Sequence, residues 1–124
     1  MQKVFTQTSA LDNWGIGVSL ACSIHCAAIP IFLISSSFIG FPTDSWEQLE
    51  LPMFLIAAII GSISTLKTYL VLKNKRPVLL LTIGLFLIVL GGAYEHIWFE
   101  TLLRVAGSIF LILSHVKNKK LLKQ

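Results

Sequence analysis

The stretch that decides the fold is an apolar run near the N-terminus, Trp14-Gly-Ile-Gly-Val-Ser-Leu-Ala-Cys22-Ser-Ile-His25-Cys26-Ala-Ala-Ile-Pro30, with further apolar residues behind it. It is long enough to cross a bilayer, because a transmembrane helix needs about 20 predominantly apolar residues. The run contains both cysteines of the chain and one of its three histidines. Residues three and four apart share a helix face, so Cys22 has His25 and Cys26 as neighbours one turn on. Titratable side chains at such depth are costly and indicate a functional site.

The composition of the whole chain indicates a membrane protein. Of its 124 residues, 55% are hydrophobic and 13% are charged, and the mean hydropathy is +0.79. Soluble domains carry about 25% charged residues. Four apolar spans, roughly 14–39, 51–72, 77–95 and 99–117, occupy most of the sequence. We therefore expect an all-α fold, a four-helix transmembrane bundle that forms a single domain over residues 1–124.

The placement of Lys and Arg predicts the orientation of this bundle. Cytoplasmic loops of membrane proteins carry an excess of both residues. The connection between the first two spans has neither, and it holds Asp44, Glu47 and Glu50. We therefore expect both termini and the loop at Asn74 in the cytoplasm. This topology accounts for the net charge of +4, so no nucleic-acid partner is expected. The basic residues near or after the second and fourth spans are Lys67, Lys73, Lys75, Arg76, Lys117, Lys119, Lys120 and Lys123.

The sequence also predicts where helices begin and where they pack closely. Asp12 or Asn13 is a candidate cap for the first helix. Pro77 is expected in the first turn of the third span, where proline is tolerated. Small residues in the second and third spans allow helices to approach closely, and we expect them to serve packing. These small residues are Gly61, Ser62, Ser64, Gly84, Gly91 and Gly92.

Two thiolates and an imidazole on one helix face favour a soft metal ion. Thiolates select soft cations, whereas carboxylates and water suit hard ones. The expected ions are Hg(II), Zn(II), Cd(II) and Cu(I), and binding would drive the thiols to deprotonate. Pro30 cannot donate to the carbonyl of Cys26, so the helix should bend beside the thiols. We expect a transported or bound ion, no permanently bound cofactor and no catalytic residues.

Two further groups are candidates for the same path. Glu95 and His96 lie in the expected outer connection, where a solvated loop and an entrance for a cation both remain open interpretations. His115 lies near the cytoplasmic end of the fourth span, either as an interfacial polar residue or as an inner acceptor on a path from the cysteines. The candidate metal residues are Cys22, Cys26, His25, Glu95, His96 and His115.

The sequence resembles the MerC-type family of mercury resistance and transport membrane proteins, as a small and divergent member. The specific part is Cys22-Ser-Ile-His25-Cys26-Ala-Ala-Ile-Pro30, which is similar to the C-x-x-H-C-x-x-x-P form of small family members. Glu95-His96 and Ser114-His115-Val-Lys-Asn118 look like later family features.

This resemblance implies a multi-pass protein of the bacterial inner (cytoplasmic) membrane. Such a protein would take Hg(II) on Cys22 and Cys26 and pass it inward. Its partners would be the lipid bilayer, the metal ion, and either a cytoplasmic thiol acceptor or further copies of the chain.

Two other classes of function remain open on the residues alone. One is a membrane haem or redox protein with axial ligands among His25, His96 and His115, although these histidines are expected at three different depths. The other is a structural or regulatory subunit whose polar side chains only hold helices together.

Overall fold

The computed structural model describes residues 10–21 and 50–123, together with the isolated positions 3, 6, 7, 24, 25, 28 and 48. Within these residues all regular structure is helical. An N-terminal helical segment covers 10–21, and it is followed by α3 (Glu50–Leu72), α4 (Arg76–Gly92) and α5 (Ile97–Leu122). The all-α expectation is confirmed. The first expected span, 14–39, falls largely outside the described residues.

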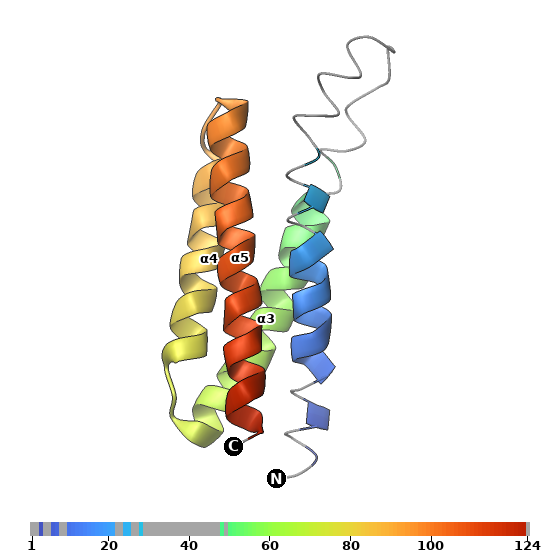
Figure 1. Cartoon of the computed structure of the whole chain (residues 1–124), viewed down its shortest axis with the longest axis vertical. Coiled ribbons are helices and arrows are strands. Elements are labelled where there is room, and N and C mark those ends of the chain that lie inside the picture. Colours follow the sequence, from blue (N-terminus) through green and yellow to red (C-terminus); the bar gives the residue numbers. More distant parts are fainter. Residues whose placement is uncertain are drawn as a thin grey trace.

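The described helices lie side by side, and consecutive ones run in opposite directions (Figure 1). The start of the N-terminal segment, the 73–75 loop and the end of α5 lie at one end of the bundle, and the 93–96 connection lies at the other. Two helices, Leu51–Leu72 and Ile97–Leu122, are long and apolar enough to cross a membrane, whereas α4 is a shorter apolar helix of 17 residues. A full set of four spans stays a prediction.

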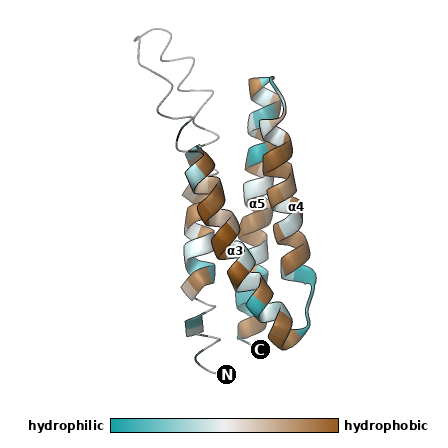
Figure 2. Cartoon of the chain, turned by 180° about the vertical axis from the view of Figure 1, so that it is seen from behind, coloured by the Kyte–Doolittle hydropathy of each residue, from teal (hydrophilic) through white to brown (hydrophobic). Residues whose placement is uncertain are grey.

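The bundle is apolar outside and polar inside, the reverse of a soluble protein. Hydrophobic residues follow the visible sides of α3 and α4 (Figure 2). Long exposed side chains such as Leu55, Ile59 and Leu70 suit lipid and not water. The buried hydrophobic residues of the described part are only Ala57, Leu81, Ile88 and Leu111. The buried polar residues there are Asp12, Ser19, His25, Ser64, Thr65, Thr68, Ser108, Ser114, His115 and Asn118.

Glycines bring α4 and α5 into close contact, as expected for Gly84 and Gly91. A Cβ added to Gly84 would lie 2.8 Å from the Gly107 carbonyl oxygen, and one added to Gly107 would lie 2.6 Å from the Gly84 carbonyl oxygen. The two backbones therefore face each other without side chains between them, which is the usual way in which small residues join membrane helices.

The loop between α3 and α4 is defined by local backbone features. Lys73 ends α3 in the left-handed conformation, with φ 54°, and its N–H donates to the Tyr69 carbonyl at 2.8 Å. The Asn74 side chain accepts the Arg76 N–H at 3.1 Å. Pro77 lies in the first turn of α4, as predicted. The predicted loop at Asn74 is therefore confirmed.

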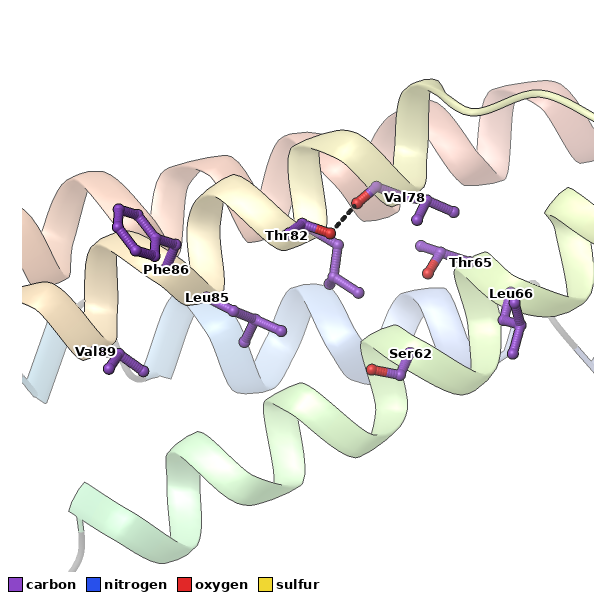
Figure 3. Close-up of a pocket in the computed structure, with 9 residues that line it drawn as sticks. Ser62, Thr65, Leu66, Val78, Thr82, Leu85, Phe86 and Val89 are labelled. Atoms are coloured by element: carbon purple, nitrogen blue, oxygen red, sulfur yellow. Dashed lines mark hydrogen bonds between the residues drawn. The ribbon is translucent and has the colours of Figure 1, made fainter.

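A groove of about 460 Å³ opens between α3 and α4 (Figure 3). The Thr82 hydroxyl on its wall donates to the Val78 carbonyl at 2.9 Å, and the Thr65 hydroxyl donates to the Gly61 carbonyl at 2.7 Å. Because these hydroxyls are satisfied by their own helices, the groove presents a mostly apolar wall to its surroundings. Its lining is Ser62, Thr65, Leu66, Val78, Leu81, Thr82, Leu85, Phe86 and Val89.

The close contact of α4 and α5 generates a stability prediction. Gly107→Ala places a methyl group against the rigid Gly84 backbone, so we expect a loss of about 1–3 kcal/mol in the free energy of unfolding. The matched control is Gly92→Ala, whose added Cβ would meet only the flexible end of Arg104, at 3.1 Å. Thermal unfolding of both variants in detergent, followed by circular dichroism, measures the difference. Equal melting temperatures for the two variants would contradict the observed helix contact.

Candidate functional site

The thiols of the predicted metal site, Cys22 and Cys26, lie outside the described residues. His25 is described, and it is helical and buried, with 9% of its surface exposed, whereas the adjacent Ile24 is 61% exposed. His25 therefore faces the protein and not lipid.

Glu95 and His96 lie at the end of the bundle opposite the 73–75 loop, and both are exposed. His96 directly precedes α5, and its carbonyl accepts the Glu100 N–H at 2.9 Å. The Glu100 carboxylate pairs with Arg104 at 2.8 Å. Among the described residues no three His, Cys, Asp or Glu side chains are grouped to hold a metal. Glu95 and His96 therefore form an open polar rim and not a preformed ligand set.

Four buried polar side chains from three helices meet near the other end of the bundle. We call Asp12, Ser64, His115 and Asn118 the polar cluster, and each is 0% exposed. The Ser64 hydroxyl donates to Asp12 Oδ1 at 2.5 Å, and Asn118 Nδ2 donates to Asp12 Oδ2 at 2.8 Å. His115 Nδ1 lies 2.9 Å from Asp12 Oδ1. Asn118 Nδ2 also lies 3.0 Å from the Ser64 hydroxyl.

This arrangement assigns the hydrogen on the His115 ring. The two oxygens of Asp12 accept from three partners, which fits the ionised carboxylate, an acceptor only. His115 therefore donates through Nδ1, and in its neutral form the ring keeps a lone pair on Nε2. Within the described part of the chain, Nε2 is buried and has no hydrogen-bond partner.

Two glycines make room for the imidazole. A Cβ added to Gly15 would overlap the His115 ring at three of its atoms, so the ring packs directly on the backbone of the N-terminal segment. A Cβ added to Gly61 of α3 would lie 3.5 Å from Nε2 and would overlap the end of Leu81. His115 is thus enclosed between two helix backbones.

Neighbouring hydrogen bonds fix the helices that carry the polar cluster. The Ser114 hydroxyl donates to the Pro77 carbonyl at 2.6 Å and joins α5 to the start of α4. At the same end, Lys119 Nζ donates to the Asn13 side chain at 2.6 Å. These contacts hold α5 against α4 and the N-terminal segment, so the position of Asp12 relative to His115 is determined on several sides.

The sequence predicts other roles for Asp12 and Ser64. Asp12 is not a helix cap, because it lies inside the helical segment 10–21 and its carboxylate is buried against α3 and α5. Ser64 does more than allow close packing, because its hydroxyl binds Asp12. His115 is fully buried, so its side chain faces the protein interior. A useful signal was available in the spacing of Asp12, Gly15 and Ser19, which puts three small or polar residues on one helix face.

The arrangement argues against a haem bound between His96 and His115. His96 precedes the helix, and His115 lies 19 residues later on it, about 28 Å along the axis at 1.5 Å per residue. Axial ligands of one haem must face each other at one depth, so these two histidines do not form such a pair.

The apolar surface, the polar interior and the two long apolar helices define a small integral membrane protein. Comparison with protein families matches residues 12–120 to the family described as MerC mercury resistance protein. The chain therefore belongs to the MerC family of mercury resistance membrane proteins, and the matched region includes both cysteines and the whole polar cluster. No curated protein and no solved structure gives a match.

The packing of His115 generates a second stability prediction, with two nearby glycines as a matched pair. Gly15→Ala inserts a methyl group where the imidazole lies, so the ring must move away from Asp12. Disturbing a buried, hydrogen-bonded network and overpacking its site should cost about 2–4 kcal/mol. Gly17→Ala meets nothing within 4 Å and removes a helical glycine, so it should stabilise the protein by about 0.5–1 kcal/mol.

Thermal unfolding in detergent measures both variants of this pair. A melting temperature of Gly15→Ala at or above that of the unmodified protein would show that the His115 ring does not rest on this backbone.

Proposed function

We propose that this protein carries a soft metal ion, Hg(II) in the first place, across the bacterial inner membrane on the thiolates of Cys22 and Cys26. His25 is the third ligand or a nearby proton acceptor. The observation that carries the proposal is the family match over residues 12–120, which includes the segment from Cys22 to Pro30. The burial of His25 supports it, since the one described side chain of this group turns toward the protein.

The chemistry of the donor set fits the cargo. Two thiolates bind soft cations far more strongly than the carboxylates and hydroxyls elsewhere in the bundle. Two thiolates also neutralise the double positive charge of Hg(II), which lowers the cost of holding it in a medium of low dielectric constant. Zn(II), Cd(II) and Cu(I) share enough of this chemistry to compete for the same ligands.

The two ends of the bundle carry different polar residues, which suits transport of the ion from one end to the other. Glu95 and His96 form an exposed polar rim at one end, where negative charge raises the local concentration of a cation. His115 lies toward the other end, which is the exit in this proposal. A cytoplasmic thiol is the acceptor that could take the ion, because only another soft ligand competes with two thiolates.

The basic residues support the orientation of a multi-pass protein with both termini in the cytoplasm. Exposed Lys73, Lys75 and Arg76 and the lysines after Val116 lie at the end of the bundle where the N-terminal segment begins. The opposite end carries Glu95 and Glu100. This asymmetry follows the positive-inside rule.

The proposed topology is tested by fusing reporters after Gln124. A cytoplasmic reporter such as green fluorescent protein is expected to be active there, and alkaline phosphatase, which needs the periplasm, is expected to be inactive. The same pair of reporters inserted in the 93–96 connection should give the opposite result. Phosphatase activity at the C-terminus would overturn the orientation.

The carrier function is tested by metal uptake into cells at equal protein levels. Changing both Cys22 and Cys26 to Ser removes the soft ligands, so we expect Hg(II) uptake to fall at least about tenfold, toward that of cells without the protein. His96→Ala should lower uptake by less, because an entrance residue concentrates the ion and does not hold it.

The control variant for uptake is Ser62→Ala, which removes an exposed hydroxyl from the apolar groove and should change nothing. If the double serine variant matches the unmodified protein for Hg(II), Zn(II), Cd(II) and Cu(I) alike, the cysteines are not the carrier site.

A further inference from the structure

The apolar groove between α3 and α4 continues toward the loop that joins these two helices. Its main part, of about 460 Å³, follows one face of α4 from Val78 to Val89 (Figure 3). A second part, of about 290 Å³, shares Val78 and Thr82 with the first and is also lined by Tyr69 and Lys75. The two parts therefore adjoin along α4, and we call them together the α3–α4 groove.

The length of this groove matches one leaflet of a bilayer. Val78 and Val89 are eleven residues apart on α4, which is about 16 Å along the helix axis. The hydrocarbon core of a bilayer is about 30 Å thick, so one leaflet contributes about 15 Å of it. The exposed Thr82 hydroxyl on the wall already donates to the Val78 carbonyl, so it offers little polarity to a ligand. The main part of the groove thus has the length and the apolar character of a site for an acyl chain.

The end of the groove next to the loop is basic. Lys75 lines it, Arg76 follows as the first residue of α4, and both are exposed. The ammonium group of Lys73 lies 5.9 Å from the centre of the Tyr69 ring, which lines the same part of the groove. Among the described residues no acidic side chain pairs with these cations, and Asp12, the one acidic residue toward this end, is fully buried. An anion could therefore approach this end without repulsion from the described part of the chain.

The groove lies on the apolar outside of the bundle. α3 and α4 diverge from the loop that joins them (Figures 1 and 3). Leu66 on α3 and Phe86 on α4 line the groove, and 52% and 64% of their surfaces are exposed. Because the bilayer core holds no water, apolar chains must fill such a space.

We propose that the α3–α4 groove binds one anionic glycerophospholipid of the leaflet beside the loop between α3 and α4. One acyl chain lies along α4 against Leu85 and Phe86. The phosphate binds Lys75, and the Tyr69 hydroxyl is a further hydrogen-bond donor to it. Basic pockets between membrane helices on the cytoplasmic side bind anionic head groups, and the proposed topology places this loop on that side. Such a lipid site is independent of which ion the protein carries.

A second copy of the chain is the competing occupant, and the charge of the loop disfavours it. Copies inserted in the same orientation carry their basic loops at the same depth. A second copy in the groove would therefore bring like charges together, which is costly. An anionic head group neutralises the same charges.

The test compares two lipids with identical chains, the anionic dioleoyl phosphatidylglycerol and the uncharged dioleoyl phosphatidylcholine. Delipidated protein in detergent is titrated with each lipid, and native mass spectrometry counts the bound molecules. A Lys or Arg near the surface contributes about fivefold in affinity, so one phosphatidylglycerol should bind at least about tenfold more tightly than phosphatidylcholine. This comparison uses the unmodified chain, and equal affinities for the two lipids overturn the proposal.

The head-group contact is tested by Lys75→Gln. This change removes the charge that lines the groove, so phosphatidylglycerol affinity should fall about fivefold while phosphatidylcholine affinity stays the same. The matched control is Lys123→Gln, which makes the same change of charge at the same end of the bundle on a residue that does not line the groove. An equal loss in both variants would show that only the overall charge of this end attracts the lipid, and the site would be wrong.

The acyl-chain contact is tested by Thr82→Phe, which fills the groove where its two parts meet and should abolish binding of the single phosphatidylglycerol. Ile83→Phe is the matched control, because Ile83 is the next residue of α4 and does not line the groove. Both positions are exposed, so neither change disturbs buried packing. If Thr82→Phe leaves the lipid bound and instead converts a dimer to a monomer, a second copy occupies the groove and the lipid proposal fails.

Discussion

The structure depends on one buried carboxylate. Asp12 lies inside a helix with an apolar surface, and lipid provides no hydrogen-bond donor to it. The donors come instead from Ser64, His115 and Asn118 on two other helices. Because an unpaired charge in this setting is very costly, the three helices are held in one arrangement. Glycine is then required at positions 15 and 61, because the imidazole that hydrogen-bonds to Asp12 lies where larger side chains would be.

A polar interior and an apolar exterior also explain why the bundle has so small a hydrophobic core. In lipid there is little to gain from burying leucine, because the solvent is as apolar as the side chain. Contact between helices comes from close backbone approach at Gly84 and Gly107 and from hydrogen bonds such as that of Ser114 to the Pro77 carbonyl. The apolar side chains are free to face outward.

The sequence predicts the helices well and their polar contacts poorly. The limits of α3, the loop at Asn74 and the place of Pro77 follow from local signals, and the inward orientation of His25 follows from the cost of exposing it to lipid. The hydrogen-bond partner of Asp12 cannot be predicted from local signals, because the bond to His115 joins residues 103 positions apart. A residue near a helix start reads as a cap unless the neighbouring helices are known. Only its spacing with Gly15 and Ser19 indicated a buried face.

The distance along the chain between Asp12 and His115 has a consequence for biogenesis. The N-terminal segment is synthesised before α3 and α5, so the residues that complete the hydrogen bonds of Asp12 leave the ribosome 52, 103 and 106 positions after it. Until α5 is inserted, the carboxylate must remain near water or in the insertion machinery. Docking of the N-terminal segment is therefore coupled to the arrival of α5. A truncated chain that ends before His115 would retain its hydrophobic helices but lack the contact that closes the bundle, and cellular quality control could recognise it by that exposed charge.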